Sequence, residues 1–273
     1  MSLDWWAATL RFTHISASLF LLGALAFPLY ARVDPLPRQS INALALTALG
    51  AGAAWIGAMA LGLAAETPSV EWLRALLFST EFGHAWLLHL GLTALLATLV
   101  LFGGRGILVV AIAGVQAASL ALFGHSAVLE GWQGGALIAA HAAHVLGAGV
   151  WMGGALSLFV FLGKADMAAG NEIVRRFSRV GYAAVAAVAL GGALNLRLVV
   201  DVWLPDIDNT YGALLTAKIA LAGAIFALAA FNRLFASKPE RRKILMRAIV
   251  AEHLLFLAVV LLAALVSAQA PHG

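Results

Sequence analysis

The sequence predicts an all-α polytopic membrane protein. Of its 273 residues, 63% are hydrophobic and only 11% are charged, and the mean hydropathy is +0.95. Soluble domains carry about 25% charged residues. The apolar residues also fall into segments of roughly 20 residues, which is the length that an α-helix needs to cross a bilayer. The chain has no cysteine, which excludes disulfides, iron–sulfur clusters and thiolate metal sites.

Eight apolar segments are long enough to cross the membrane. They are predicted at 8–31, 42–65, 82–103, 106–124, 137–163, 178–202, 211–235 and 244–268. The third and fourth segments are separated only by Gly103-Gly-Arg-Gly106, whose Gly-Gly and Arg-Gly pairs favour a tight turn. The segment from Val70 to Leu77 is too short to cross, and it is predicted to be a helix at the membrane interface.

The positive charges predict the orientation in the membrane. Most lysines and arginines follow segments one, three, five and seven, and Arg74 is the single one placed on the opposite side. The first group contains Arg32, Arg38, Arg105, Lys164, Arg175, Arg176, Arg179, Arg233, Lys238, Arg241, Arg242, Lys243 and Arg247. Cytoplasmic loops are enriched in basic residues, so both termini are predicted outside, on the periplasmic side of a bacterial inner membrane. The net charge of +4 follows from this topology and does not indicate nucleic acid. No cleavable signal peptide is predicted.

The histidines gather on one side of this topology. His14, His84, His89, His125, His141 and His144 are all predicted toward the outer side. His14, His89 and His144 each lie about 10–12 Å below the outer interface, at 1.5 Å per residue. Ionisable side chains inside a bilayer indicate function, and imidazole is a ligand of copper, zinc, iron and nickel. The alternative is that each histidine only makes a hydrogen bond between helices.

Two further histidines extend this group. His141 and His144 are three residues apart, so they share one helix face and are able to bind one ion together. His84 and His89 are five residues apart, about 140° around a helix, which argues against a joint site. His84 is therefore predicted either as an outer capture residue or as a plain surface residue. Likewise, His141 either adds a ligand or only meets water.

Other residues are candidates for tuning the site. Arg11 precedes His14 by three residues and is either a partner that supports that histidine as a ligand or a residue at the membrane interface. Trp151 shares the helix face of His144. The thioethers of Met59 and Met152 suit Cu(I), although methionines in apolar helices usually serve packing.

Two ionisable residues complete the candidates. Lys218 either extends toward the interface or is a buried cation that faces an electron-rich group. Glu252 is either a proton or ion relay toward the inside or a neutral or paired buried carboxyl.

The two halves of the chain, 1–130 and 131–273, resemble each other at an offset of about 130 residues. The matched positions are His14 with His144, Gly23 with Gly153, Phe82-Gly83 with Tyr211-Gly212, His89 with Lys218, and Ile107-Leu108 with Ile244-Leu245. Four segments per half would make the halves parallel repeats within one membrane domain, 1–273, related by an axis along the membrane normal.

Several short motifs resemble a known family. They are Arg176-Phe177-Ser178, Tyr211-Gly212 with Leu215 and Lys218, Asn232-Arg233, Glu252, and His144 followed by Val150-Trp151-Met152-Gly153-Gly154. These resemble the membrane domain of the copper resistance D family (CopD, also found in YcnJ-like proteins), most densely over 137–268. The resemblance implies copper uptake or resistance across the inner membrane, with His144, Lys218 and Glu252 as matching positions. It also implies a periplasmic copper carrier of the CopC type, which is not fused here and would be a separate partner. His141 stands where the family pattern leads us to expect an acidic residue.

The predicted function is copper import through a periplasm-facing histidine site. His14, His89 and His144 would be the core ligands, His141 and His84 the capture ligands, and Lys218 and Glu252 the gating residues. The chain contains no Ser-His-Asp arrangement and no phosphate-binding glycine loop, which favours a transporter over an enzyme. The alternative is a membrane cytochrome that holds haem b between His14, His89 and His144 and moves electrons. A third hypothesis is a scaffold for copper insertion without transport of its own.

Overall fold

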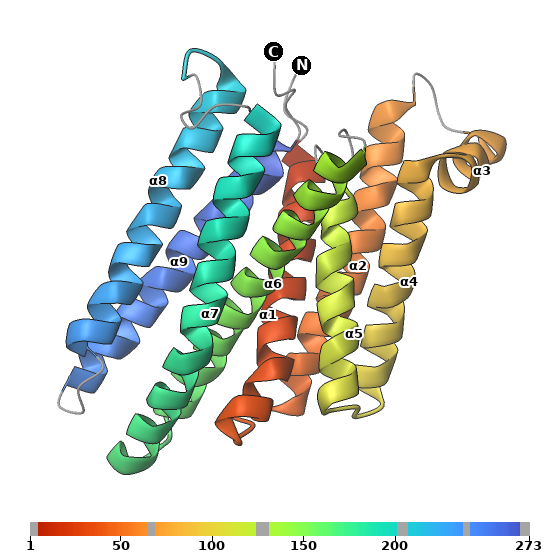
Figure 1. Ribbon diagram of the computed structural model, residues 1–273. Coiled ribbons are helices and arrows are strands. Elements are labelled where there is room, and N and C mark those ends of the chain that lie inside the picture. Colours follow the sequence, from red (N-terminus) through yellow and green to blue (C-terminus); the bar gives the residue numbers. More distant parts are fainter. Residues whose placement is uncertain (1–4, 65–68, 124–130, 201–206, 237–240, 268–273) are drawn as a thin grey trace.

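The computed structural model of the protein is a bundle of long, roughly parallel and antiparallel helices (Figure 1). The structure describes residues 5–64, 69–123, 131–200, 207–236 and 241–267. Every regular element within these ranges is a helix, which confirms the predicted all-α class. Seven helices of the described chain are long and apolar enough to cross a membrane.

The helices follow the predicted segments closely. They are α1 (Trp5–Ala31), α2 (Arg38–Leu63), α3 (Val70–Ser79), α4 (Glu81–Leu101), α5 (Ile107–Ala118), the 3-10 helix η1 (Ser119–Leu122), α6 (Gly131–Leu162), α7 (Met167–Val200), α8 (Thr210–Phe231), the π-helical turn η3 (Asn232–Ala236) and α9 (Arg242–Val266). The short helix α3 buries none of its residues and lies at one end of the bundle (Figure 1).

The fourth predicted segment is the one that falls below the spanning length. Ile107–Leu122 comprises α5 and η1, and its length is about 26 Å at 1.5 Å per α-helical and 2.0 Å per 3-10 residue. Figure 1 nevertheless shows α5 running beside α4, back toward the end of the bundle where α6 begins. The start of α1 and the end of α9 also lie at one end. This path agrees with an even number of crossings, and the predicted eight crossings and outer termini stay predictions.

One predicted boundary was wrong. The sixth segment was expected to begin at 178, which placed Arg175 and Arg176 in a loop, but α7 already begins at Met167. Glu172 bonds to Arg175 and, at 2.8 Å, to Arg176, and such pairs three and four residues apart stabilise a helix. These charges therefore extend the helix beyond its apolar part.

Basic residues also close the helix ends on the predicted inner side. Arg38 donates to the carbonyl of Leu101 at 2.6 Å, and Arg176 donates to that of Ala31 at 3.0 Å. Both carbonyls lie at helix C-termini, where unpaired carbonyl oxygens carry partial negative charge. The residues that predict the topology thus also hold neighbouring helices together.

Two glycines let α1 and α6 cross closely at the centre of the bundle. A Cβ atom at Gly23 would lie 2.5 Å from Gly153 Cα, and one at Gly153 would lie 2.7 Å from Gly23 Cα. Side chains here would push the two backbones apart. Gly23 and Gly153 are matched positions in the predicted repeat. If a two-fold axis related the two halves, residues beside that axis would contact their own counterparts, as these two glycines do.

Candidate functional site

Two histidines meet inside the N-terminal half. His14 on α1 and His89 on α4 are fully buried, and their Nε2 atoms are 2.7 Å apart. The rings meet nearly edge to face, with centroids 4.9 Å apart and planes at 76°. Two histidines that are 75 residues apart in the sequence thus place two imidazole nitrogens at one point.

The other nitrogen of each ring is also held. His14 Nδ1 lies 2.7 Å from the carbonyl oxygen of Ala48 on α2, and His89 Nδ1 lies 2.7 Å from the hydroxyl of Ser119. A carbonyl oxygen only accepts, and the Ser119 hydroxyl already donates to the carbonyl of Gln116 at 2.7 Å. Both Nδ1 atoms therefore donate in this arrangement. The lone pairs of both Nε2 atoms then face each other, whereas a Ser119 hydroxyl turned toward His89 Nδ1 would leave one Nε2–H to bond to the other ring.

A shell of buried polar side chains surrounds the pair. The amide nitrogen of Gln116 on α5 lies 3.1 Å from Thr93 Oγ1, 3.3 Å from Ser18 Oγ and 3.5 Å from His89 Nε2. The sequence interpretation did not single out these residues. A signal was present, because a hydroxyl residue follows both His14 and His89 by four positions, and Gln116 interrupts an otherwise apolar segment.

Aromatic side chains enclose the pair. Trp55 and Trp86 pack edge to face with ring centroids 4.4 Å apart, and His89 lies 5.4 Å from the ring of Phe123. The guanidinium carbon of Arg11 lies 4.8 Å over Trp55. Arg11 Nε is buried and has no hydrogen-bond partner within the described part of the chain. The predicted neighbour of His14 thus lies over the aromatic wall and acts electrostatically on the imidazole.

His144 lies in the C-terminal half. It is half-buried on α6, and its Nδ1 is 2.8 Å from the carbonyl oxygen of Val188 on α7. Lys218 acts electrostatically on both His141 and His144, and Arg11 acts on His141. In the ranges that the structure describes, no three His, Cys, Asp or Glu side chains form a group that could hold one metal ion. A site shared by His14, His89 and His144 therefore stays a prediction.

The remaining predicted residues are dispersed. His84 is exposed, and its Nε2 lies 3.0 Å from the carbonyl oxygen of Phe78. Met59 is half-buried on α2. Met152 is buried on α6, and its backbone carbonyl accepts from His253 Nε2 at 3.1 Å. His125 lies outside the described residues.

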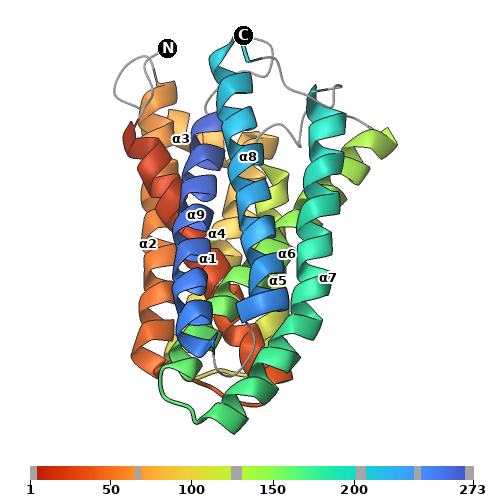
Figure 2. The same cartoon turned by 90° about the vertical axis from the view of Figure 1, so that its left-hand side faces the viewer.

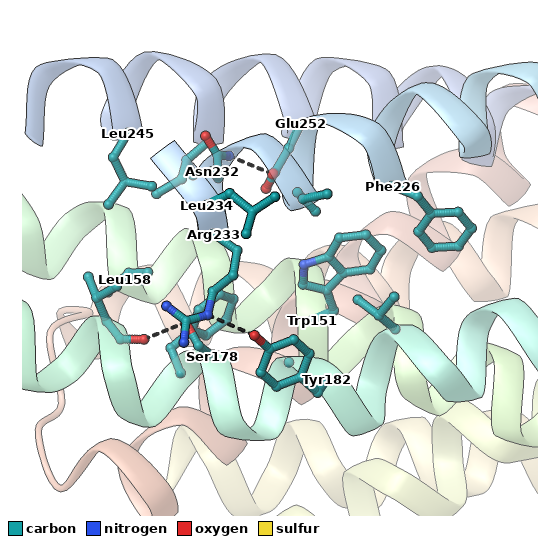
Figure 3. Close-up of a pocket in the computed structure, with 17 residues that line it drawn as sticks. Trp151, Leu158, Ser178, Tyr182, Phe226, Asn232, Arg233, Leu234, Leu245 and Glu252 are labelled. Carbon is teal, nitrogen blue, oxygen red and sulfur yellow. Dashed lines mark hydrogen bonds between the residues drawn. The ribbon is translucent and has the colours of Figure 1, made fainter. Parts of the chain in front are cut away.

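A cavity of about 360 Å³ lies between α6, α7, α8, η3 and α9 (Figure 3). Most of its wall is apolar, including Trp151, whose ring stacks on Phe226 at 5.8 Å. It is also lined by several of the residues that carry the family resemblance, namely Trp151, Phe177, Ser178, Asn232, Arg233 and Glu252. Motifs that are far apart in the sequence therefore line one space.

Two polar pairs lie in this cavity wall. Asn232 donates its amide to Glu252 Oε1 at 2.7 Å, and both residues are buried. Arg233 donates to the hydroxyl of Tyr182 at 2.8 Å (Figure 3). Figure 2 shows that α8 and α9 form one side of the bundle. α8 leads into η3, and α9 carries Glu252.

Two family models match the chain, and together they cover most of its length. Copper resistance protein D-like, N-terminal domain, matches residues 2–136, and Copper resistance protein D matches residues 171–266. The chain belongs to the copper resistance D family. The resemblance predicted from the second half is thus confirmed, and the family match extends over the half that holds the histidine pair.

Two curated relatives agree with this family. The chain is 28% identical over 258 residues to Copper resistance protein D of Pseudomonas syringae pv. tomato, covering 86% of this chain and 83% of that protein. It is 29% identical over 232 residues to Copper transport protein CutJ of Bacillus subtilis (strain 168), covering 80% of this chain and 40% of that protein. The chain therefore spans less than half of CutJ. No solved structure matches this chain.

Proposed function

We propose that this copper resistance D family protein binds copper at the His14–His89 pair and carries it inward across the membrane. The observation that supports the proposal is the convergence of two imidazole Nε2 atoms, 2.7 Å apart, in a fully buried place. Two facing lone pairs repel each other unless a metal ion binds both or one ring carries a proton on Nε2 and donates it to the other. Metal-binding histidines characteristically donate their other ring nitrogen to a carbonyl or similar acceptor, as His14 and His89 do.

The donor set fits copper. Imidazole suits Cu(II), which prefers square-planar or tetragonal sites. With metal–nitrogen bonds of about 2 Å, nitrogens 2.7 Å apart subtend about 85° at the ion. This angle corresponds to neighbouring corners of a square. A half-turn of the Gln116 amide would present its oxygen as a further ligand, since the amide nitrogen lies 3.5 Å from His89 Nε2.

The names of the relatives support copper as the cargo. One relative is named a copper resistance protein and the other a copper transport protein. In our proposal, His84 and His141 are the first contacts at the outer side, and His144 with Lys218 lines the way inward. The protein would lie in a bacterial inner membrane with periplasmic termini and receive copper from a separate CopC-type carrier.

No observation favours the cytochrome alternative. A haem iron between two imidazoles needs two bonds of about 2 Å on opposite sides, which separates the two nitrogens by about 4 Å. The Nε2 atoms of His14 and His89 are 2.7 Å apart, so a porphyrin does not fit between them in this arrangement.

Alanine at His14 or His89 tests the site. We expect each of His14→Ala and His89→Ala to reduce copper bound by the purified protein from about one per chain to near zero, because one remaining imidazole is a weak ligand. His253→Ala, at a histidine on α9 outside the proposed copper path, is the control and should keep its copper. Equilibrium dialysis with metal analysis measures the stoichiometry, and copper entry into proteoliposomes measures transport.

The outcomes separate the possible ligand sets. Unchanged stoichiometry in both pair variants would sink the assignment. Loss of copper in His144→Ala would show that this histidine belongs to the same site, as first predicted from the sequence. Copper binding without entry into proteoliposomes would contradict the transport part and favour a scaffold.

A further inference from the structure

A single buried carboxyl borders the cavity of the C-terminal half. Glu252 on α9 is only 4% exposed, and its one hydrogen bond in the described chain is the 2.7 Å contact from Asn232 Nδ2 to Oε1. The ion pairs found among the described residues do not include Glu252. An ionised carboxylate without a cation is costly inside a bilayer, so Glu252 needs a positive partner.

The neighbouring amide has an unused acceptor. Asn232 is 7% exposed, and its Oδ1 is buried with no hydrogen-bond partner in the part of the chain that the structure describes. A buried carbonyl-type oxygen without a donor is uncommon, because leaving one unsatisfied costs about 1–3 kcal/mol. The Asn232–Glu252 pair therefore contains more acceptor atoms than the described part of the protein supplies with donors.

We propose that Glu252 is a proton-binding site that takes up and releases a proton through this cavity. Binding converts the carboxylate to a carboxylic acid, which removes the buried charge and creates one O–H donor. Asn232 Oδ1 is the nearby acceptor that lacks a donor. One proton thus satisfies both residues.

The wall composition favours a proton over a metal cation. Hard cations such as Ca²⁺ take 6–8 oxygen ligands and Mg²⁺ about six. The side-chain oxygens in this wall come from Glu252, Asn232, Ser178 and Tyr182, and the remaining lining is largely apolar. Tyr182 is engaged with Arg233, and the Ser178 hydroxyl donates to the carbonyl of Val174. Too few oxygens remain for a metal cation, whereas a proton needs one.

The charged and titratable neighbours leave this role to Glu252. On η3, Arg233 donates to Tyr182 of α7 and lies over its ring at 5.9 Å. α6 contributes Trp151 and Leu158 to the wall, and neither side chain is titratable. On α9 itself, His253 faces the other way: its Nε2 contacts the Met152 carbonyl, and its ring stacks on Phe20 of α1 at 5.7 Å.

The proton also supplies a driving force for copper movement. The sequence contains no nucleotide-binding loop, and a proton gradient is a source of energy for transport that needs none. Release of the Glu252 proton to one side and uptake from the other would link copper passage to the proton gradient. This coupling rests on the copper-transporting function proposed above, whereas proton binding at Glu252 does not.

Infrared difference spectroscopy during a pH titration of the purified, copper-free protein tests the proton site. We expect a C=O stretching band of a buried carboxylic acid that appears as the pH is lowered. Glu252→Gln keeps the shape and the bond to Asn232, and it should abolish this band. Glu172→Gln, at an exposed, arginine-paired carboxyl on α7, is the matched control and should retain it.

Three outcomes decide between the possibilities. A band that persists in Glu252→Gln, or no band in the unaltered protein, overturns the proposal. Loss of the band on adding NaCl at constant pH overturns it as well, because Na⁺ would then occupy the site. Asn232→Leu should shift the midpoint of the titration, and an unchanged midpoint contradicts the part assigned to Asn232.

Proteoliposomes then test the coupling. A pH-sensitive dye inside the vesicles should report proton movement on addition of copper, and Glu252→Gln should reduce that signal at least about tenfold while copper binding at the histidine pair persists. If the infrared band belongs to Glu252 but no copper enters, the proposed function fails and the proton site stands. If copper enters at an equal rate with and without the carboxyl, the coupling fails alone.

Discussion

The two halves of the molecule hold a histidine in the same way but give it different partners. His14 on α1 bonds to the carbonyl of Ala48 on α2, and Gly52 lies against its ring four residues further on. His144 on α6 bonds to the carbonyl of Val188 on α7, and Gly192 lies against its ring, also four residues further on. The helix pairs α1–α2 and α6–α7 thus repeat one local arrangement.

The difference lies on the helix that follows. α4 supplies His89, which completes an imidazole pair, whereas α8 supplies Lys218, which acts on His144 as a charge. An ammonium group has three donors and no acceptor, so it is no metal ligand while charged. One local arrangement therefore occurs in both halves, with a second imidazole beside it in the first half and the charge of a lysine acting on it in the second.

The largest expected effect comes from separating α1 and α6 where they cross closely at Gly23 and Gly153. A Cβ atom at Gly23 would lie 2.2 Å from the Gly149 carbonyl oxygen, so Gly23→Ala has to separate two backbones. We expect a loss of about 3 kcal/mol or more of unfolding free energy, the upper range for overpacking. Denaturant unfolding in detergent, followed by tryptophan fluorescence, measures this loss.

Gly57→Ala is the matched control for Gly23→Ala. Nothing lies within 4 Å of a Cβ atom at Gly57, in the interior of α2. Because alanine favours helix over glycine by up to about 1 kcal/mol, this variant should be as stable as the original protein or slightly more stable. Equal losses in both variants would contradict the close crossing of α1 and α6.

An intermediate effect is expected from the glycines beside the two histidines. A Cβ atom at Gly52 would lie 2.7 Å from His14 Nδ1, so Gly52→Ala should displace the ring and weaken copper binding about 10- to 100-fold, as loss of support around a metal ligand does. At Gly192 the same atom would lie 3.2 Å from His144 Nδ1. Gly192→Ala should leave copper affinity unchanged in a competition titration, and an equal loss there would place copper in the second half too.

The smallest effect is expected from a substitution at position 218. Lys218→His gives the second half the imidazole that its counterpart position has in the first half. We expect copper bound per chain to rise from about one to about two, measured by dialysis and metal analysis. Lys218→Gln, which removes the charge without adding an imidazole, should stay at about one. A value of one in Lys218→His would show that His144 and position 218 do not converge as His14 and His89 do.

Much of the fold was predictable because its signals are local in the sequence. Segment length and hydropathy indicated helices within a few residues of α1, α2, α4 and α9. The error at α7 arose because its first turns are charged, and a search for apolar segments ends where the charges begin. The segment that became α5 and η1 was predicted within two residues of its ends, but hydropathy does not report where an α-helix tightens into a 3-10 turn.

The candidate site was predictable only in part. Depth along a helix follows from counting residues, so His14, His89 and His144 were placed together at one level. The rotation of each helix about its axis does not follow from that count. It is set by packing between helices, and here packing turns His89 toward His14 while His144 bonds to α7.

By itself, the sequence determined the class of the protein, the approximate ends of most of its long apolar segments and its family motifs. These depend on composition and spacing along one chain. Only the tertiary structure decided that His14 meets His89, that Gln116 and Ser119 support them, and that Glu252 bonds to Asn232 in the wall of a cavity. These contacts join helices that are distant in sequence, and the close approach at Gly23 and Gly153 sets how the helices face one another.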